Sequence, residues 1–295
     1  MKIGILGLEK LVEVQRSTGV AILIPKINIY MNFPARKSAN FHETANKIIS
    51  DALNEKITAL EEMCAGIIKK LLEKYAHATR AEIDMEAEYV VVRRTPASGQ
   101  KTQEMYKILG RAISEDGVIR KMIGAEVTGM TSCPCAQEGL LEYSKKMLGK
   151  KFSNEEVAAI LKTVPLASHN QRNVSQLLIE VPESYSVDVD ELIQMLENSM
   201  SSKIYEVLKR EDEISVVLKS HANPSFVEDI VRKILVSVAH RYKNLPDECM
   251  VFVKSESFES IHQHNAIAER ISSLKELRRE VFGLNRKIYD VKNRG

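Results

Sequence analysis

The sequence contains no tryptophan, and its aromatic residues amount to only 5% of 295 residues. Proteins that bind single-stranded nucleic acids stack bases on aromatic side chains, and a net charge of +2 gives no basic excess for a polyanion. The sequence also has no run of about 18 apolar residues, and its N-terminus lacks the basic, apolar and small segments of a signal peptide. We therefore expect neither a nucleic-acid partner nor a membrane partner.

Cysteine is scarce as well, with only Cys64, Cys133, Cys135 and Cys249. Four cysteines in a chain of this length do not form a disulfide scaffold, so we expect a reducing, cytoplasmic compartment with free thiols. An apolar content of 44% and a charged content of 28% are typical of a soluble globular protein. The length suggests about two domains.

Apolar periodicity predicts an alternation of strands and helices that occurs twice. The first half has expected strands at 9–16 and 20–31, helices at 42–53 and 56–76, and strands at 81–94, 103–115 and 118–128. The second half has an expected strand at 172–181, helices at 188–198 and 226–242, a strand at 249–257, and a tail of mixed helix and charge at 266–288. This order predicts an α+β protein with modules at 1–135 and 166–295, joined by a helical insertion or connector at 136–165.

The segment Gly129–Glu138 contains two closely spaced thiols between an expected strand, 122–127, and an expected helix, 140–148. Pro134 stiffens the turn between Cys133 and Cys135. A disulfide within so short a loop would be strained, so the thiols are free or one of them binds a metal. The alternative is that both are small buried residues in a turn.

Four further polar stretches contribute imidazoles and carboxylates: 168–172, 209–213 at the end of a helical run, 226–229, and 256–265. Thiolate, imidazole and carboxylate groups together suit a borderline divalent metal with one position open for water. The spacing of His262 and His264 would place both rings on one side of a strand. Each residue also has a simpler interpretation: His169 as a hydrogen-bonded loop residue and Glu213 as a solvated one. The residues alone therefore predict only a candidate mononuclear metal hydrolase site.

Residues around the start of the expected helix at 226–242 can also be interpreted as helix caps. Ser225 is a suitable N-cap, and Glu228 stands at the third helical position, as in a capping box. On this interpretation the carboxylate of Glu228 stabilises the helix and has no role in a site.

Four motifs occur in one order: Gly-Met-Thr-Ser-Cys-Pro-Cys-Ala-Gln, His-Asn-Gln-Arg, Asn-Pro-x-Phe-Val-Glu-Asp, and Glu-Ser-Phe-Glu-Ser-Ile-His-x-His. Together they resemble the GTP cyclohydrolase type IB family. The first motif is most similar to the archaeal branch, the methanopterin-pathway GTP cyclohydrolase (GTP cyclohydrolase IV). The resemblance extends from about residue 5 to about residue 270. It implies the tunnelling fold, in which antiparallel sheets carry helices on one face, with two modules per chain and a homo-oligomer, a dimer or tetramer.

The resemblance also implies roles for individual residues. The implied metal ligands are Cys133, His169 and Glu213, the implied guanine anchor is Glu228, and the implied catalytic residues in the pocket are Cys135, His262 and His264. At 37–43, where the family often has Lys-Gly-x-His-Met-Ser-Arg, this sequence has Asn40 and Glu43 in place of a histidine and an arginine. This difference weakens the case for phosphate contacts from that loop.

Arg172, Lys209 and Arg210 are candidates for phosphate binding, because a guanidinium matches phosphate oxygens bidentately. The alternative for these three residues is a solvated basic cluster.

The implied activity is a metal-dependent GTP cyclohydrolase that releases formate. The archaeal branch implies iron(II), with zinc or manganese possible, and a 7,8-dihydroneopterin 2',3'-cyclic phosphate product with loss of diphosphate. A metal lowers the pKa of bound water from about 15.7 toward about 7, and a histidine carries protons to the ring nitrogens.

Three other functions compete with this one. The bacterial-type reaction would yield 7,8-dihydroneopterin triphosphate for folate synthesis. A tunnelling-fold reductase would reduce a deazaguanine nitrile with a cysteine nucleophile and a reduced nicotinamide. A non-catalytic purine-binding protein would use a metal only to hold its fold.

Overall fold

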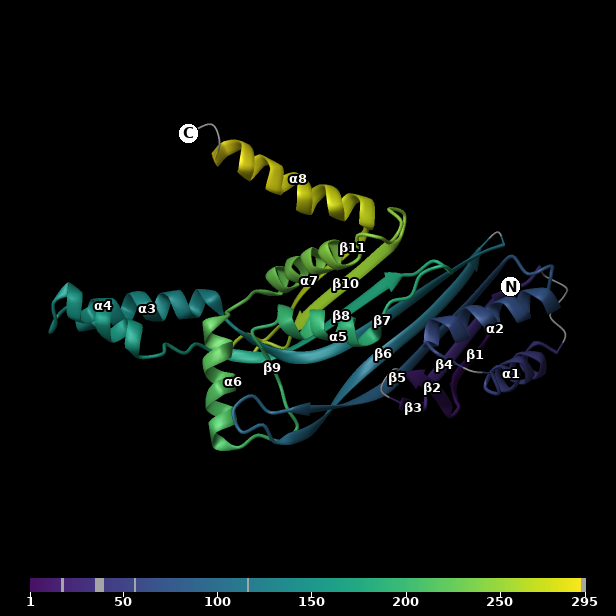
Figure 1. The fold of residues 1–295 in the computed structure, drawn as a ribbon, viewed down its shortest axis with the longest axis horizontal. Helices are drawn as coiled ribbons and strands as arrows, with labels where there is room; N and C mark the ends of the chain where they lie inside the picture. Colours follow the sequence, from purple (N-terminus) through teal and green to yellow (C-terminus); the bar gives the residue numbers. More distant parts are fainter. Residues whose placement is uncertain (17–18, 35–39, 56, 116, 293–295) are drawn as a thin grey trace.

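The computed structural model describes residues 1–16, 19–34, 40–55, 57–115 and 117–292. One antiparallel sheet runs through most of the described chain (Figure 1). Its strand order is β1 (Lys2–Glu9), β4 (Lys26–Asn32), β5 (Arg80–Arg94), β6 (Lys101–Glu115), β7 (Val118–Ser132), β8 (Asn170–Glu180), β10 (Met250–Ser257) and β11 (Ala266–Ser273), with the short β9 (Ser202–Lys203) beside β7. The strands β2 (Val12–Arg16) and β3 (Gly19–Leu23) form a separate pair. Because β7 pairs with β8, the sheet is continuous across the two halves of the chain.

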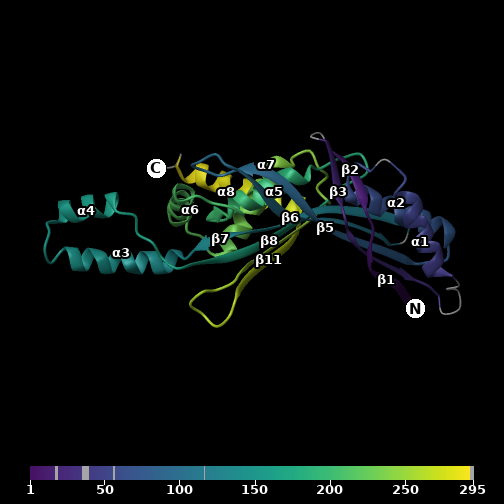
Figure 2. The same cartoon turned by 90° about the horizontal axis from the view of Figure 1, so that it is seen from below.

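The helices are α1 (Phe41–Ala52), α2 (Leu60–Lys74), α3 (Pro134–Leu148), α4 (Asn154–Thr163), α5 (Val189–Ser199), α6 (Arg210–Ala222), α7 (Val227–Arg241) and α8 (Leu274–Lys292). Among them, α2 packs on β5 to β7, α5 on β7 and β8, and α7 on β10 and β11. The pair α3 and α4 projects from the body of the molecule, and α3 buries none of its side chains (Figure 2). None of the described helices is long and apolar enough to cross a membrane.

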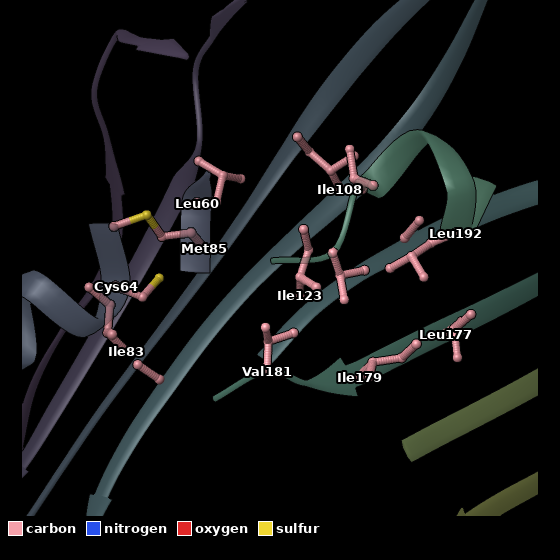
Figure 3. Close-up of a cluster of buried hydrophobic side chains, with 14 of the residues drawn as sticks. Leu60, Cys64, Ile83, Met85, Ile108, Ile123, Leu177, Ile179, Val181 and Leu192 are labelled. Atoms are coloured by element: carbon pink, nitrogen blue, oxygen red, sulfur yellow. The ribbon is translucent and has the colours of Figure 1, made fainter. Parts of the chain in front are cut away.

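The core lies between the sheet and these helices, because alternate residues of each strand face the same side. Figure 3 shows Leu60 of α2 near Met85 of the sheet, and Leu192 of α5 near Leu177. Gly110 permits this packing, since a Cβ there would lie 2.6 Å from the Cβ of Leu60. The helices α2, α5 and α7 thus cover one face of the sheet, and this confirms the expected antiparallel α+β architecture.

The expected strand at 20–31 is in fact two strands, β3 and β4, which belong to different sheets. The break falls at 24–25, where Pro25 has no backbone N–H for a ladder hydrogen bond. The tail differs too, since it begins with the edge strand β11 before α8. The charges of Glu269 and Arg270 concealed this strand, because an edge strand tolerates charged side chains that a central strand does not. Residues 17 and 18, between the expected strands at 9–16 and 20–31, lie outside the described residues.

The expected capping of α7 is wrong by one residue. Phe226 is the N-cap, and the backbone N–H of Phe226 donates to the Asp229 carboxylate at 3.2 Å. Ser225 lies before the helix and accepts a hydrogen bond from Lys233. The capping function therefore belongs to Asp229, and the carboxylate of Glu228 does not take part in it.

Candidate functional site

A cavity of about 330 Å³ lies where β7 ends and β8 begins. The predicted residues that line it are Cys133, Cys135, His169, Glu228 and His262. They come from four separate segments of the chain: the start of α3, the segment before β8, the first turn of α7, and the loop after β10. The fold therefore brings together a thiol, an imidazole and a carboxylate that the sequence only suggested might meet.

Cys133 and His169 are held side by side by the backbone. The Cys133 N–H donates to the His169 carbonyl at 3.1 Å, and the Ser168 hydroxyl donates to the Cys133 carbonyl at 3.0 Å. Cys133 is also the N-cap of α3, where the Ala136 N–H donates to its Sγ at 3.4 Å. Its sulfur therefore stands at the positive end of the α3 dipole.

The His169 ring has one nitrogen engaged by protein groups. Its Nδ1 lies 3.1 Å from both Gln171 Oε1 and Ser260 Oγ. The amide oxygen of Gln171 only accepts, so Nδ1 carries the hydrogen and Nε2 keeps its lone pair. A histidine that ligates a metal is usually fixed in this way through its other nitrogen. The thiol of Cys133 and the imidazole of His169 are thus donors that suit a borderline divalent ion.

His262 and His264 lie in the loop between β10 and β11, so the prediction that they share one side of a strand is wrong. Their rings are stacked, with centroids 5.4 Å apart and planes inclined by 22°. His262 lines the cavity, whereas His264 is not among its lining residues. Stacking, and not strand alternation, places the two rings together.

The other predicted residues do not line this cavity. Glu213 is exposed on the first turn of α6, Arg172 is exposed on β8, and Lys209 and Arg210 stand at the start of α6. Among the described residues, no group of three or more His, Cys, Asp or Glu side chains lies close enough to hold a metal ion. Of the three predicted ligands, the fold therefore brings only Cys133 and His169 together, and the assignment of Glu213 stays a prediction.

The segment 209–213 begins a helix and does not end one, contrary to the sequence interpretation. Asp212 is fully buried there, and it accepts hydrogen bonds from the Ala97 and Ser98 N–H groups and from the Ser98 hydroxyl. It also accepts one from the Lys209 N–H. Burial raises the pKa of Asp212, but these hydrogen bonds outweigh it and hold that pKa well below its ordinary value. Asp212 thus anchors α6, and with it Glu213, to the β5–β6 hairpin.

Sequence reasoning missed Glu259 and Gln171, which both line the cavity. The Gln171 amide donates to Glu259 Oε1 at 3.2 Å, while Glu259 Oε2 is buried without a hydrogen-bond partner among the described residues. Glu259 is therefore a second carboxylate in the site. Its place three residues before His262 was the available signal.

A larger cavity, of about 1070 Å³, lies over the middle of the sheet and contains no cysteine or histidine. Its lining includes the ion pair of Arg111 and Asp84, at 2.9 Å. It therefore lacks the thiolate and imidazole donors that the smaller cavity combines. The smaller cavity is therefore the candidate active site.

Comparison with known proteins identifies the family of this chain. The family model of the type I GTP cyclohydrolase folE2 matches residues 1–268. The chain belongs to this family. As a member it is an enzyme, and the resemblance of the sequence motifs to a GTP cyclohydrolase family is confirmed. The matching model does not carry the narrower type IB label. The non-catalytic interpretation is accordingly set aside.

Curated members of the family are similar over nearly the whole chain. GTP cyclohydrolase MptA of Methanothermobacter thermautotrophicus is 42% identical over 294 residues, covering 96% of this chain and 92% of that protein. GTP cyclohydrolase MptA of Methanosphaera stadtmanae is 42% identical over 289 residues, covering 95% and 92%. The protein of the same name from Methanocaldococcus jannaschii is 39% identical over 292 residues, covering 95% and 93%.

The fold alone is shared with a more distant protein. Uricase from Arthrobacter globiformis superposes with a TM-score of 0.56 at 7% identity, covering 92% of this chain and 93% of that one. At this identity the likeness concerns architecture and not chemistry.

Proposed function

We propose that this protein is a metal-dependent GTP cyclohydrolase of methanopterin synthesis. It opens the imidazole ring of GTP, releases formate, and forms 7,8-dihydroneopterin 2',3'-cyclic phosphate with loss of diphosphate. The observation that carries the proposal is that Cys133, His169 and Glu228 line one cavity in a chain of the GTP cyclohydrolase family. The MptA relatives, at about 40% identity, support the archaeal branch over the bacterial type.

The carboxylate of Glu228 recognises the guanine. An ionised carboxylate accepts two hydrogen bonds, which matches the N1–H and the exocyclic amine of guanine and not the edge of adenine. Glu228 is available for this task because Asp229 performs the capping of α7. The cavity, at about 330 Å³, has the size of a small-molecule site.

Cys133 and His169 Nε2 would hold the divalent ion, with Glu213 as the third proposed ligand. Iron(II) is the expected ion, and when bound it would provide the Lewis-acid chemistry that activates a water at neutral pH. His262 lines the cavity, and its imidazole carries a proton to the opening ring. Cys135 and His264 stand beside these residues as further proposed catalytic groups.

The phosphate end of GTP extends out of the cavity, whose lining contains no lysine or arginine. Arg172, Lys209 and Arg210 remain the proposed phosphate contacts, and they lie on β8 and at the start of α6. The cavity itself therefore selects the base, and the proposed contacts to the charged chain lie outside it.

We also propose that the protein is a cytoplasmic homo-oligomer, with two modules in each chain. The described sheet ends at β1 and β11, whose edges carry Leu6, Ile267 and Ile271 at 64%, 56% and 67% exposure. Open edges with apolar side chains favour pairing with further strands. Light scattering during size-exclusion chromatography tests this, and a monomer would contradict it.

The decisive experiment is mass spectrometry of the product from anaerobic, iron-loaded enzyme with GTP. Formate together with the cyclic phosphate supports the proposal. The triphosphate product would instead indicate the bacterial-type reaction. NADPH consumption with a deazaguanine nitrile, without GTP turnover, would indicate the reductase.

A further inference from the structure

His221 and Gln137 are neighbours of the candidate site, but they are not among the proposed metal ligands and do not line the cavity. His221 is in the last turn of α6 and is 8% exposed. Gln137 is in the first turns of α3, four residues after Cys133. Figure 1 shows α6 beside the base of the projecting helix α3.

The His221 ring contacts two backbone carbonyls. Its Nδ1 lies 2.9 Å from the Val217 carbonyl and its Nε2 lies 3.0 Å from the Ser168 carbonyl. Carbonyl oxygens only accept, so each of the two ring nitrogens faces a carbonyl to which it can donate.

Gln137 completes the connection. Its side-chain amide donates to the His221 carbonyl at 2.8 Å and to the Leu166 carbonyl at 3.0 Å. Through these bonds α3, the segment 166–169 and the end of α6 are tied together. Those three elements carry Cys133, His169 and Glu213.

We propose that His221 and Gln137 are positioning residues. They hold the three elements that carry the proposed metal ligands in fixed positions relative to one another. The proposal rests on the metal-dependent function above. A group that orients metal ligands from behind typically changes metal affinity by about 10- to 100-fold when it is removed. His221 does this through the backbone of the residue next to His169, and not by contact with the metal or GTP.

The test uses the full chain, freed of metal by chelation and titrated with cobalt(II). The wild-type protein should show the absorption of a thiolate–cobalt bond. In His221→Gln, one amide nitrogen cannot reach carbonyls on opposite sides of the former ring, so cobalt should bind about 10- to 100-fold more weakly. In the iron-loaded variant kcat should fall while KM for GTP changes little, because Glu228 lies on α7, outside these bonds.

His240→Gln is the matched control, since His240 also stands in the last turn of a helix, where it contacts Phe282. It should keep wild-type cobalt affinity. If His221→Gln does not fold, Gln137→Met removes the other half of the connection and should also weaken cobalt binding. Wild-type affinity in the folded variants overturns the positioning role. Absence of a thiolate–cobalt band in the wild-type protein instead overturns the metal site itself.

Discussion

Glu228 and Asp229 are adjacent carboxylates with different surroundings: Asp229 accepts a hydrogen bond from the Phe226 N–H, whereas Glu228 lines the cavity. One residue stabilises the start of α7, and its neighbour is left for a ligand. The two can therefore be separated experimentally, because a change at one position should affect stability and a change at the other should affect GTP binding.

Glu228→Gln should abolish detectable GTP binding while metal stays bound. The amide turns a donor toward the donors of the guanine edge, and the unpaired buried groups cost about 1–3 kcal/mol or more. Isothermal titration calorimetry with GTP measures the loss. Asp229→Asn is the control, and it should lower the melting temperature but keep GTP affinity. Unchanged binding in Glu228→Gln would show that another group anchors the base.

Cys133→Ala should remove most of the bound metal and all turnover while the fold is kept. Cys133 is the soft donor of the proposed set, and its side chain is only partly buried, so the truncation leaves little cavity. Emission spectroscopy on the purified variant gives the metal content, with Cys135→Ala as the control that keeps its metal. Full metal occupancy in Cys133→Ala would end the ligand assignment.

His262→Ala should retain metal and lose about 10²–10⁴-fold in turnover, as expected for removal of a positioned general acid or base. His264→Ala should have a smaller effect, because His264 contacts the site through the stacked ring of His262. Single-turnover kinetics together with metal analysis tests both. Loss of metal from either variant would make that histidine a ligand, and Glu213 would then be the assignment to abandon.

Glu61→Gln should make the protein more stable above neutral pH. Glu61 is buried on α2, and burial raises its pKa from 4.5 to about 7. Between these values the unfolded chain has released a proton that the folded chain keeps, so the free energy of unfolding falls as pH rises. A shift of this size corresponds to about 3 kcal/mol.

Chemical denaturation at pH 5 and at pH 8 measures this effect. The wild-type protein should lose stability between the two values and Glu61→Gln should not. The exposed Glu73→Gln should behave as the wild type does. An equal loss in Glu61→Gln and the wild type would contradict the assignment.

Local signals predicted most of the elements, because alternation and helical periodicity are properties of neighbouring residues. The edge strand β11 was missed because its charges conceal the alternation. The convergence of Cys133 and His169 was predictable only as a possibility, since 35 residues, including α3 and α4, lie between them. What brings them together is the pairing of β7 with β8, a long-range register that no local pattern encodes.

Glu259 illustrates a property that a sequence does not show, namely the burial and hydrogen bonding of single atoms. A sequence shows that a carboxylate is near two histidines in the chain. It does not show that one oxygen of Glu259 is bonded to Gln171, or that the other is buried without a hydrogen-bond partner in the part of the chain that the structure describes. Burial and bonding of single atoms depend on segments that are distant in the chain. Residues of this kind are recognised only when the fold is known.

The projecting helix α3 begins at the active site and extends away from it. Its N-cap is Cys133, and its last residue, Leu148, lies 14 residues beyond the first, about 21 Å along the axis. A small rotation at the thiol is therefore magnified into a larger sweep at the far end of the helix. A fluorophore attached near Leu148 would move when the surroundings of the Cys133 sulfur change, and it would report that change from outside the site.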